Sequence, residues 1–208
     1  MDITSLYTSI PHRDGLRALQ FFLDRRQDPT PSTNTLLRLV ELVLTSNTFE
    51  FAGEFYKQTS GAAMGTKMGP SYACLFIGYL EHEIFRQYSG IVPGLYHRYI
   101  DDIVGAAACS HQELNDFIAF VGSFHPAIKY TFAISETSLS FLDINVSILG
   151  PGLRTSVYYK ETDSHCYLSY TSSHPDSTKA AIPYSQMLRI RRLCSDNADF
   201  RRQVQFVA

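Results

Sequence analysis

Residues 95–105 read LYHRYIDDIVG, two apolar runs that meet at the adjacent carboxylates Asp101 and Asp102. Strand-forming residues on both sides of a polar pair favour a β-hairpin with the acids at its tip. One interpretation of the acidic pair is an ordinary solvated turn, because the short side chain of Asp readily hydrogen-bonds nearby backbone. The alternative is a divalent-metal site, since Mg²⁺ takes hard oxygen ligands and needs only one or two carboxylates held at a strand end.

A third acid, Asp2, lies in the opening segment MDITSLYTSIP at residues 1–11. This segment resembles the first catalytic motif of reverse transcriptases, and YIDD at 99–102 resembles the third. The glycine-rich segment QTSGAAMGTKMGP at 58–70 is similar to the second motif. Together with FLDI at 141–144, these segments are most similar to Penelope-like retroelement reverse transcriptases, and the resemblance covers most of the 208 residues.

The composition indicates a folded protein that is not embedded in a membrane. Hydrophobic residues make up 45% of the chain and charged residues 18%, which is enough to bury a sizeable core in one compact unit with an appended lobe. The longest apolar runs are far shorter than a membrane helix, and the N-terminal residues lack the pattern of a signal peptide. We therefore expect an intracellular protein, and the resemblance implies the nucleus for the parent element.

The charge distribution bears on nucleic-acid binding, and the cysteine spacing bears on zinc sites and disulfides. The net charge of -2 is unusual for a nucleic-acid-binding protein, but residues 151–208 carry 8 Lys and Arg against 5 Asp and Glu, whereas residues 1–150 carry 10 against 15. A basic C-terminal segment suits a duplex backbone, although a solvated helix face explains the same arginines. The four cysteines lie far apart, which favours reduced thiols over a zinc site or a disulfide framework.

Apolar spacing predicts the first elements. Helices are predicted over residues 13–26 and 33–46, and we expect both to pack into the core. The alternating segment 48–57 predicts a hairpin that leads into the glycine-rich loop. Pro70 suits the first turn of the helix that follows this loop.

The second half continues with shorter elements. Ser110 and Glu113 predict a capping box that starts a helix ending near Phe124. Strands are predicted over 129–135, 140–148 and 155–159, and a helix over 183–194 after a linker at 161–183. This order predicts an α+β fold, similar to a reverse-transcriptase palm, with helices on a small, mainly antiparallel sheet and a partial thumb-like C-terminal lobe. We assign residues 1–160 to the palm and 161–208 to the linker and thumb-like segment.

The resemblance implies an RNA-directed DNA polymerase that uses two Mg²⁺ or Mn²⁺ ions. In such a reaction a primer 3'-hydroxyl attacks the α-phosphate of a deoxynucleoside triphosphate (dNTP), and two ions assist the attacking and leaving oxygens. The resemblance assigns Asp2 and Asp101 as the ligands that bridge both ions. Asp102 is a third candidate, because adjacent residues on a strand point to opposite faces unless the turn redirects one of them.

Further candidates surround these acids. The resemblance places Tyr7 under the incoming sugar, where its ring would select deoxynucleotides; the alternative is a half-buried strand tyrosine. The glycines at 61, 65 and 69 allow the backbone to approach a nucleotide or template base, near Gln58 and Thr66. Met64 stands where many other reverse transcriptases carry glutamine, so the resemblance assigns no residue to the template contact.

The remaining candidates concern the primer and the leaving group. We predict that Tyr99 packs beneath the primer end; a core tyrosine is the simpler alternative. The resemblance implies that Lys129 lies near the leaving triphosphate as general acid or counter-charge; an exposed lysine is the simpler alternative. The segment 141–144 resembles a primer-gripping turn in which Asp143 is structural. A duplex-backbone contact in the thumb-like lobe is predicted for Arg189, Arg191 and Arg192.

Other enzyme classes lack support in the sequence. The seven histidines have no metal-binding spacing, and neither a Ser-His-Asp set nor a phosphate-binding loop is apparent. The resemblance implies fingers before the first motif and a nuclease domain in many full-length relatives, yet only Met1 precedes Asp2. We therefore expect a fragment whose partners are RNA template, DNA primer and dNTP. The alternative is an inactive retroelement remnant that binds nucleic acid or protein.

Overall fold

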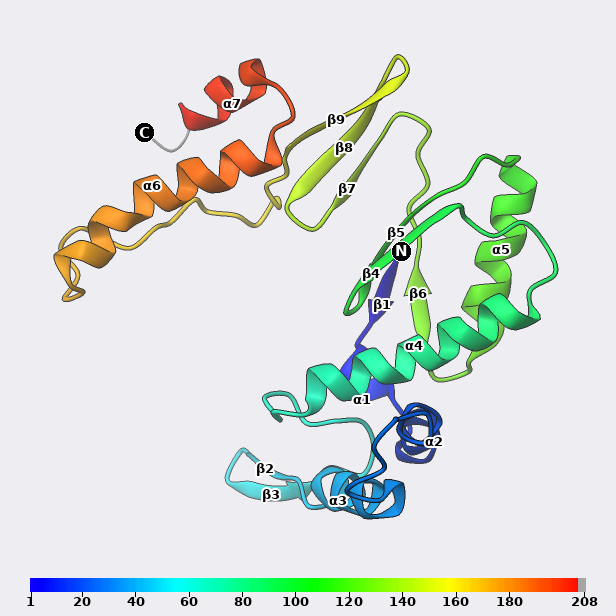
Figure 1. The fold of residues 1–208 in the computed structure, drawn as a ribbon. Coiled ribbons are helices and arrows are strands. Elements are labelled where there is room, and N and C mark those ends of the chain that lie inside the picture. Colours follow the sequence, from blue (N-terminus) through cyan, green and yellow to red (C-terminus); the bar gives the residue numbers. More distant parts are fainter. Residues whose placement is uncertain (206–208) are drawn as a thin grey trace. The chain divides into compact units, whose positions relative to one another are not determined.

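The computed structural model describes residues 1–205 and contains two compact units, the first spanning Met1–Phe132 and the second beginning at Ala133 (Figure 1). Each unit has its own sheet and its own cluster of buried residues. The assignment of residues 1–160 to a palm and 161–208 to a thumb-like segment concerns functional parts and stays a prediction.

The first unit is built around a four-stranded antiparallel sheet in the order β4-β5-β1-β6. Its strands are β1 (Asp2–Thr4), β4 (Leu95–Tyr99), β5 (Asp102–Ala106) and β6 (Lys129–Thr131). The predicted hairpin with the acidic pair at its tip is confirmed as β4 and β5. The strand predicted over 129–135 ends at Thr131, before the boundary of the unit.

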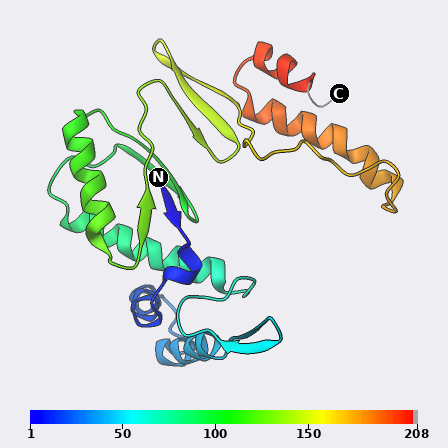
Figure 2. The same ribbon diagram turned by 180° about the vertical axis from the view of Figure 1, so that it is seen from behind.

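Two long helices cover one face of this sheet, α4 (Gly69–Gln87) and α5 (His111–Phe124). Ile3 and Ile103 of the sheet are buried in the same cluster as Phe76 of α4 and Phe117 of α5. Figure 2, a view from behind, shows α4 crossing the sheet and α5 lying beside the sheet. Both predicted helix starts are confirmed, since a proline occupies the first turn of α4 and the Ser110–Glu113 capping box begins α5.

The segment between β1 and α4 forms short helices and a separate hairpin. After α1 (Leu6–Ser9), the predicted helices appear as α2 (His12–Leu23) and α3 (Thr33–Thr45), and the predicted hairpin as β2 (Thr48–Phe51) and β3 (Glu54–Lys57). The expectation that α3 packs into the core is confirmed for part of its apolar face. Leu44 is buried in the core cluster and Val40 packs against it, whereas Leu39 and Leu42 are 54% and 61% exposed.

The second unit begins with a three-stranded antiparallel sheet of β7 (Ser138–Phe141), β8 (Ile144–Leu149) and β9 (Gly152–Val157). The single strand predicted over 140–148 is wrong, because the chain reverses at Leu142, whose φ of 51° lies in the left-handed region. The strand predicted over 155–159 begins earlier, at Gly152, and ends at Val157.

Helices α6 (Asp176–Leu193) and α7 (Asn197–Val204) complete the second unit. The prediction that the helix starts at Pro183 and that 161–183 is a linker is wrong, because α6 starts at Asp176 and carries Pro183 in its interior. Proline favours a first helical turn, which led the prediction to place the start there. An acid at Asp176 instead marks the first turn, where it complements the helix dipole.

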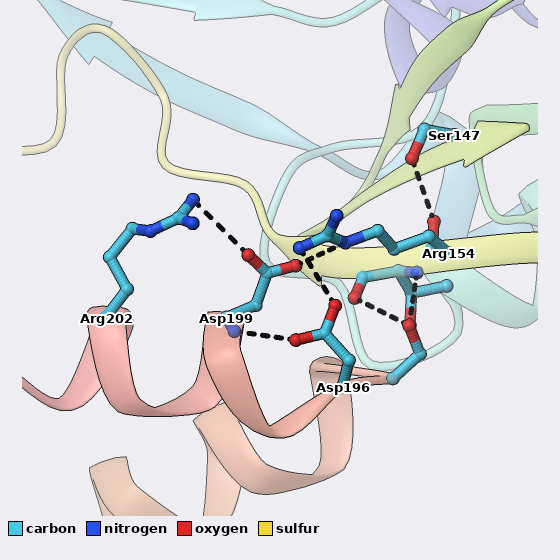
Figure 3. A network of polar contacts seen from close by, with 7 residues as sticks. Ser147, Arg154, Asp196, Asp199 and Arg202 are labelled. Atoms are coloured by element: carbon cyan, nitrogen blue, oxygen red, sulfur yellow. Dashed lines mark hydrogen bonds and ion pairs between the residues drawn. The ribbon is translucent and has the colours of Figure 1, made fainter. Parts of the chain in front are cut away.

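A charged network attaches α7 to the sheet of the second unit (Figure 3). The Arg154 guanidinium on β9 contacts the Asp199 carboxylate at 2.7 Å and the Asp196 carboxylate at 2.8 Å. Asp199 is buried, Asp196 accepts a hydrogen bond from the Asp199 backbone N–H at the helix start, and Arg202 pairs with Asp199 at 3.3 Å. This network compensates the burial of a carboxylate, which is costly when unpaired.

The predicted α+β class with helices on small, mainly antiparallel sheets is confirmed. Among residues 1–205, none of the helices combines the length and apolar character needed to cross a bilayer. All four cysteines are free.

Candidate active site

The acids of the first and third motifs lie side by side on adjacent strands. Asp2 of β1 is the direct cross-strand partner of Asp102 of β5. Met1 and Ile103, the next pair along, exchange both backbone hydrogen bonds, at 2.9 and 2.8 Å. Asp2 and Asp102 therefore form a non-hydrogen-bonded pair, the arrangement in which Cα atoms approach to about 4.5 Å and side chains lie closest.

Both carboxylates belong to the sheet face opposite the helices. Ile3 and Ile103 follow Asp2 and Asp102 and are buried against the helices, so alternation along a strand directs the two acids to the other face. On the same face, Lys129 of β6 is exposed and pairs in register with Thr4. The predicted acids Asp2 and Asp102 and the predicted cation Lys129 thus share one surface of a three-strand segment.

Asp101 occupies the turn just before β5. Its backbone carbonyl accepts a hydrogen bond from the Ile3 N–H at 3.1 Å, and the preceding Ile100 has a φ of 57°. Because Asp101 precedes the strand, the rule that adjacent strand residues face opposite sides does not restrict it. The turn places Asp101 in the lining of a pocket of about 590 Å³.

This pocket collects residues from the first, second and third motifs. Tyr7, Gly65, Thr66 and Asp101 line it, all four of them predicted site residues. Tyr7 lies on α1, so its alternative assignment as a strand tyrosine is wrong. Burial raises the pKa of the Tyr7 hydroxyl, and the nearby Asp101 carboxylate raises it further.

The glycine-rich loop is docked on α1 by its backbone. Ala62 donates to the Tyr7 carbonyl at 2.7 Å, and the His12 Nε2 atom lies 2.8 Å from the Gly61 carbonyl oxygen. A Cβ atom on Gly61 would lie 2.6 Å from the Thr8 Cα atom, so the close approach that Gly61 allows is to α1. At Gly65, in contrast, a Cβ would meet nothing within 4 Å, which leaves its backbone accessible.

Some predicted residues lie outside the pocket lining, and two polar residues of the lining were not predicted. The Gln58 side chain donates to the Ser60 carbonyl at 2.8 Å within the loop, and Tyr99 is 60% exposed at the end of β4. Ser5 and Lys67 line the pocket without having been predicted. The position of Lys67 beside Thr66 in the second motif was the available signal for it.

The acids fit an open site for a divalent cation better than a closed protein cage. Within residues 1–205, no group of three or more His, Cys, Asp or Glu side chains is placed to hold a metal. Mg²⁺ does not require one, because it usually keeps water and substrate phosphates beside one or two carboxylates. Like charges directly opposite each other on a sheet are unfavourable, so a divalent cation between these two carboxylates would be stabilising.

The Met1 amino group adds a positive charge beside the same acids. Burial lowers its pKa, while Asp102 and then Asp2 raise it.

In the second unit, the predicted thumb arginines make different contacts. Arg189 of α6 pairs with Asp143, in the turn between β7 and β8, at 3.0 Å. Arg191 donates to the Asn197 side chain at 3.1 Å and lies over the Phe200 ring, and Arg192 is exposed. The segment 141–144 is a turn, as its resemblance implied, and Asp143 ties it to α6.

Comparisons with known proteins support the fold. A solved structure of telomerase from Candida albicans, in complex with the TWJ fragment of telomeric RNA, matches with a TM-score of 0.62 at 10% sequence identity. The match covers 90% of this chain and 33% of the telomerase chain. The fold is α+β and reverse-transcriptase palm-like. The comparison with curated proteins yields no match.

A family model described as an animal helix-turn-helix domain matches residues 166–208. This range contains α6 and α7, together with residues 206–208, which lie outside the described part of the chain. Helix α7 was not predicted from the sequence. Its available signals were Asp196 before the helix and the arginines 201 and 202 at its end, which are typical of a capped helix.

Proposed function

We propose that this chain is the palm of an RNA-directed DNA polymerase of the Penelope-like retroelement type. The observation that carries the proposal is the convergence of three distant motifs. Asp2 of the first motif pairs with Asp102 of the third, and Asp101 lines one pocket with Gly65 and Thr66 of the second.

In this proposal, Asp2, Asp101 and Asp102 hold two Mg²⁺ or Mn²⁺ ions. The ions would supply activation of the primer 3'-hydroxyl and stabilisation of the leaving pyrophosphate. The chain's own residues bind and orient the dNTP: Tyr7 lies under the sugar and excludes a 2'-hydroxyl, while the open backbone at Gly65 admits the nucleotide. Lys129, on the same face as the acids, neutralises or protonates the leaving group.

The proposed partners are an RNA template, a DNA primer and dNTP. The matched telomerase was solved with a telomeric RNA fragment, and the excess of basic residues over 151–208 is compatible with contact to a nucleic-acid backbone. The proposed location for a parent element of this type is the nucleus. This chain spans about a third of the telomerase chain it matches.

The second candidate is a non-catalytic remnant that binds nucleic acid or protein. The helix-turn-helix match at residues 166–208 favours it, because such a pair of helices can bind a duplex without any chemistry at the acids. Under this alternative, the second unit accounts for binding, and substitution of the acids changes nothing.

Primer extension separates the two candidates. The purified chain is tested on an RNA template with a DNA primer, dNTP and Mg²⁺, beside Asp101→Asn and the control Asp116→Asn, which alters an exposed carboxylate on α5. We expect extension by the wild type and the control, and its loss in Asp101→Asn. Duplex binding in an anisotropy titration, without extension and without a Mg²⁺-dependent thermal shift, would favour the remnant.

A further inference from the structure

A partly buried arginine connects helix α4 to the turn that carries Asp101. Arg98 lies on β4, three residues before Asp101, and its side chain is 13% exposed. It faces α4, where the Glu81 carboxylate receives it in a two-point contact, Nε to Oε1 at 2.7 Å and Nη2 to Oε2 at 2.9 Å. Two parallel bonds of this kind fix the plane of a guanidinium as well as its position.

The third nitrogen of the same guanidinium reaches the turn itself. Arg98 Nη1 donates to the Ile100 carbonyl at 3.1 Å. Ile100 has a φ of 57°, a left-handed conformation that is strained for a β-branched residue and persists only where surrounding contacts hold it. The conformation of Ile100 sets the direction in which the chain enters Asp101 and Asp102.

Other groups stabilise the ion pair rather than the turn. The Tyr96 hydroxyl donates to Glu81 Oε1 at 3.0 Å, and Arg98 Nη2 donates to the Cys74 carbonyl of α4 at 3.3 Å. Burial, and then the Glu81 carboxylate, raise the pKa of Tyr96, so this hydroxyl keeps its proton and remains a donor. Although burial lowers the pKa of Arg98, its hydrogen bonds and charge interaction with Glu81 outweigh that effect and raise it.

We propose that Arg98 is a positioning residue for the acidic turn: held by Glu81, it fixes Ile100 and thereby sets where the Asp101 carboxylate lies relative to α4 and the pocket. This inference rests on the proposed function, because it assigns to the turn a metal-binding role. Without Arg98, the left-handed turn loses the side-chain hydrogen bond to the Ile100 carbonyl. The Asp101 and Asp102 carboxylates then adopt other orientations, while the rest of the sheet stays packed against the helices.

The test replaces Arg98 by lysine, which keeps the charge but cannot bind Glu81 at two points and reach Ile100 together. The matched control is Arg154→Lys, which removes an arginine with two carboxylate partners in the second unit. A second control, Tyr96→Phe, removes one bond to Glu81 and leaves the Arg98–Ile100 bond in place. Circular dichroism and thermal unfolding establish that each variant is folded.

Two readouts are taken on the full chain. Hydrogen exchange followed by NMR reports the backbone amides of Ile3 and Ile103, whose bonds flank the acidic pair. Mn²⁺ titration followed by electron paramagnetic resonance reports metal affinity. We expect Arg98→Lys to accelerate exchange at these two amides and to weaken Mn²⁺ binding by roughly 10- to 100-fold, the usual cost of losing a residue that orients metal ligands. Both controls should stay near wild type.

The outcomes that overturn the inference are specific. Arg98→Lys with wild-type Mn²⁺ affinity contradicts a positioning role, whatever its effect on stability. Exchange that rises equally across all strands of the sheet, with no excess at Ile3 and Ile103, also contradicts it, since that result describes general loosening. A wild-type chain that binds no Mn²⁺ refutes the proposed metal site, whereas the exchange data still decide whether Arg98 orders the turn.

Discussion

Asp2 lies directly opposite Asp102 in the antiparallel pairing of β1 with β5, on the sheet face away from helices α4 and α5. Such an arrangement of like charges is unfavourable by itself, because opposed carboxylates in a non-hydrogen-bonded pair lie close together. A divalent cation bound by both carboxylates would offset this repulsion, as proposed above.

Tyr7 should control the choice between dNTP and ribonucleotide. Its ring lines the pocket beside Asp101, so Tyr7→Ala removes the group proposed to meet a 2'-hydroxyl. We expect the ratio of kcat/KM values for dNTP over ribonucleotide to fall roughly 10- to 100-fold, as measured by single-nucleotide primer extension. Tyr56→Ala, on the exposed β2–β3 hairpin, is the control. An unchanged ratio in Tyr7→Ala would reject the role of Tyr7 as a sugar gate.

The two glycines with positive φ in the loop should differ in their tolerance of alanine. Gly61→Ala combines a left-handed conformation with a Cβ placed 2.6 Å from the Thr8 backbone, so we expect a loss of about 3 kcal/mol in unfolding free energy. Gly65→Ala meets no neighbour within 4 Å and should cost only about 1 kcal/mol. Urea unfolding measures both. Equal losses would show that the loop is not docked on α1.

The acid stability of the second unit should depend on Asp196. Its hydrogen bond from the Asp199 backbone N–H, together with the nearby Arg154 charge, holds the pKa of Asp196 below its ordinary value of 3.8. A lowered pKa stabilises the folded state at pH values above the unfolded pKa, and this contribution is lost as pH falls through the folded pKa. Asp196→Asn should therefore be less stable than wild type at neutral pH.

The measurement is urea unfolding of both proteins as a function of pH. The difference in unfolding free energy between wild type and Asp196→Asn should stay constant at neutral pH and shrink as pH falls below about 4. Asn retains an acceptor for the helix start, so the variant isolates the charge. A difference that persists unchanged at low pH would contradict the assigned cause.

Features set by local rules were predicted well from the sequence. Three such features are confirmed: the hairpin with Asp101 and Asp102 at its tip, the capping box at Ser110 and the start of α4 near Pro70. Each depends on a few neighbouring residues. The strand pattern over 140–148 missed the break at Leu142, which only the family resemblance indicated, because this left-handed position carries no glycine as a signal. The start of α6 was misplaced because Pro183, a frequent first-turn residue, is accommodated inside the helix.

The sequence named candidate residues for the site but not their geometry. The resemblance named Asp2, Asp101 and Asp102, yet only strand register reveals that Asp2 faces Asp102 while Asp101 lines the pocket. Arg98 was missed for a similar reason. No neighbouring residue distinguishes Arg98 from a solvated strand residue. The positioning role proposed for Arg98 depends on Glu81, which lies on helix α4, 17 residues earlier in the sequence.

We propose that Asp2, Asp101 and Asp102 bind divalent cations in one open site that water and substrate phosphates complete. Titration of the chain with Mn²⁺, followed by electron paramagnetic resonance, tests it most directly. We predict saturable binding that weakens by at least about tenfold in Asp2→Asn and in Asp101→Asn, because each removes a direct ligand, while Asp116→Asn binds as wild type does. Absence of saturable binding, or equal affinity in all four proteins, would contradict the account.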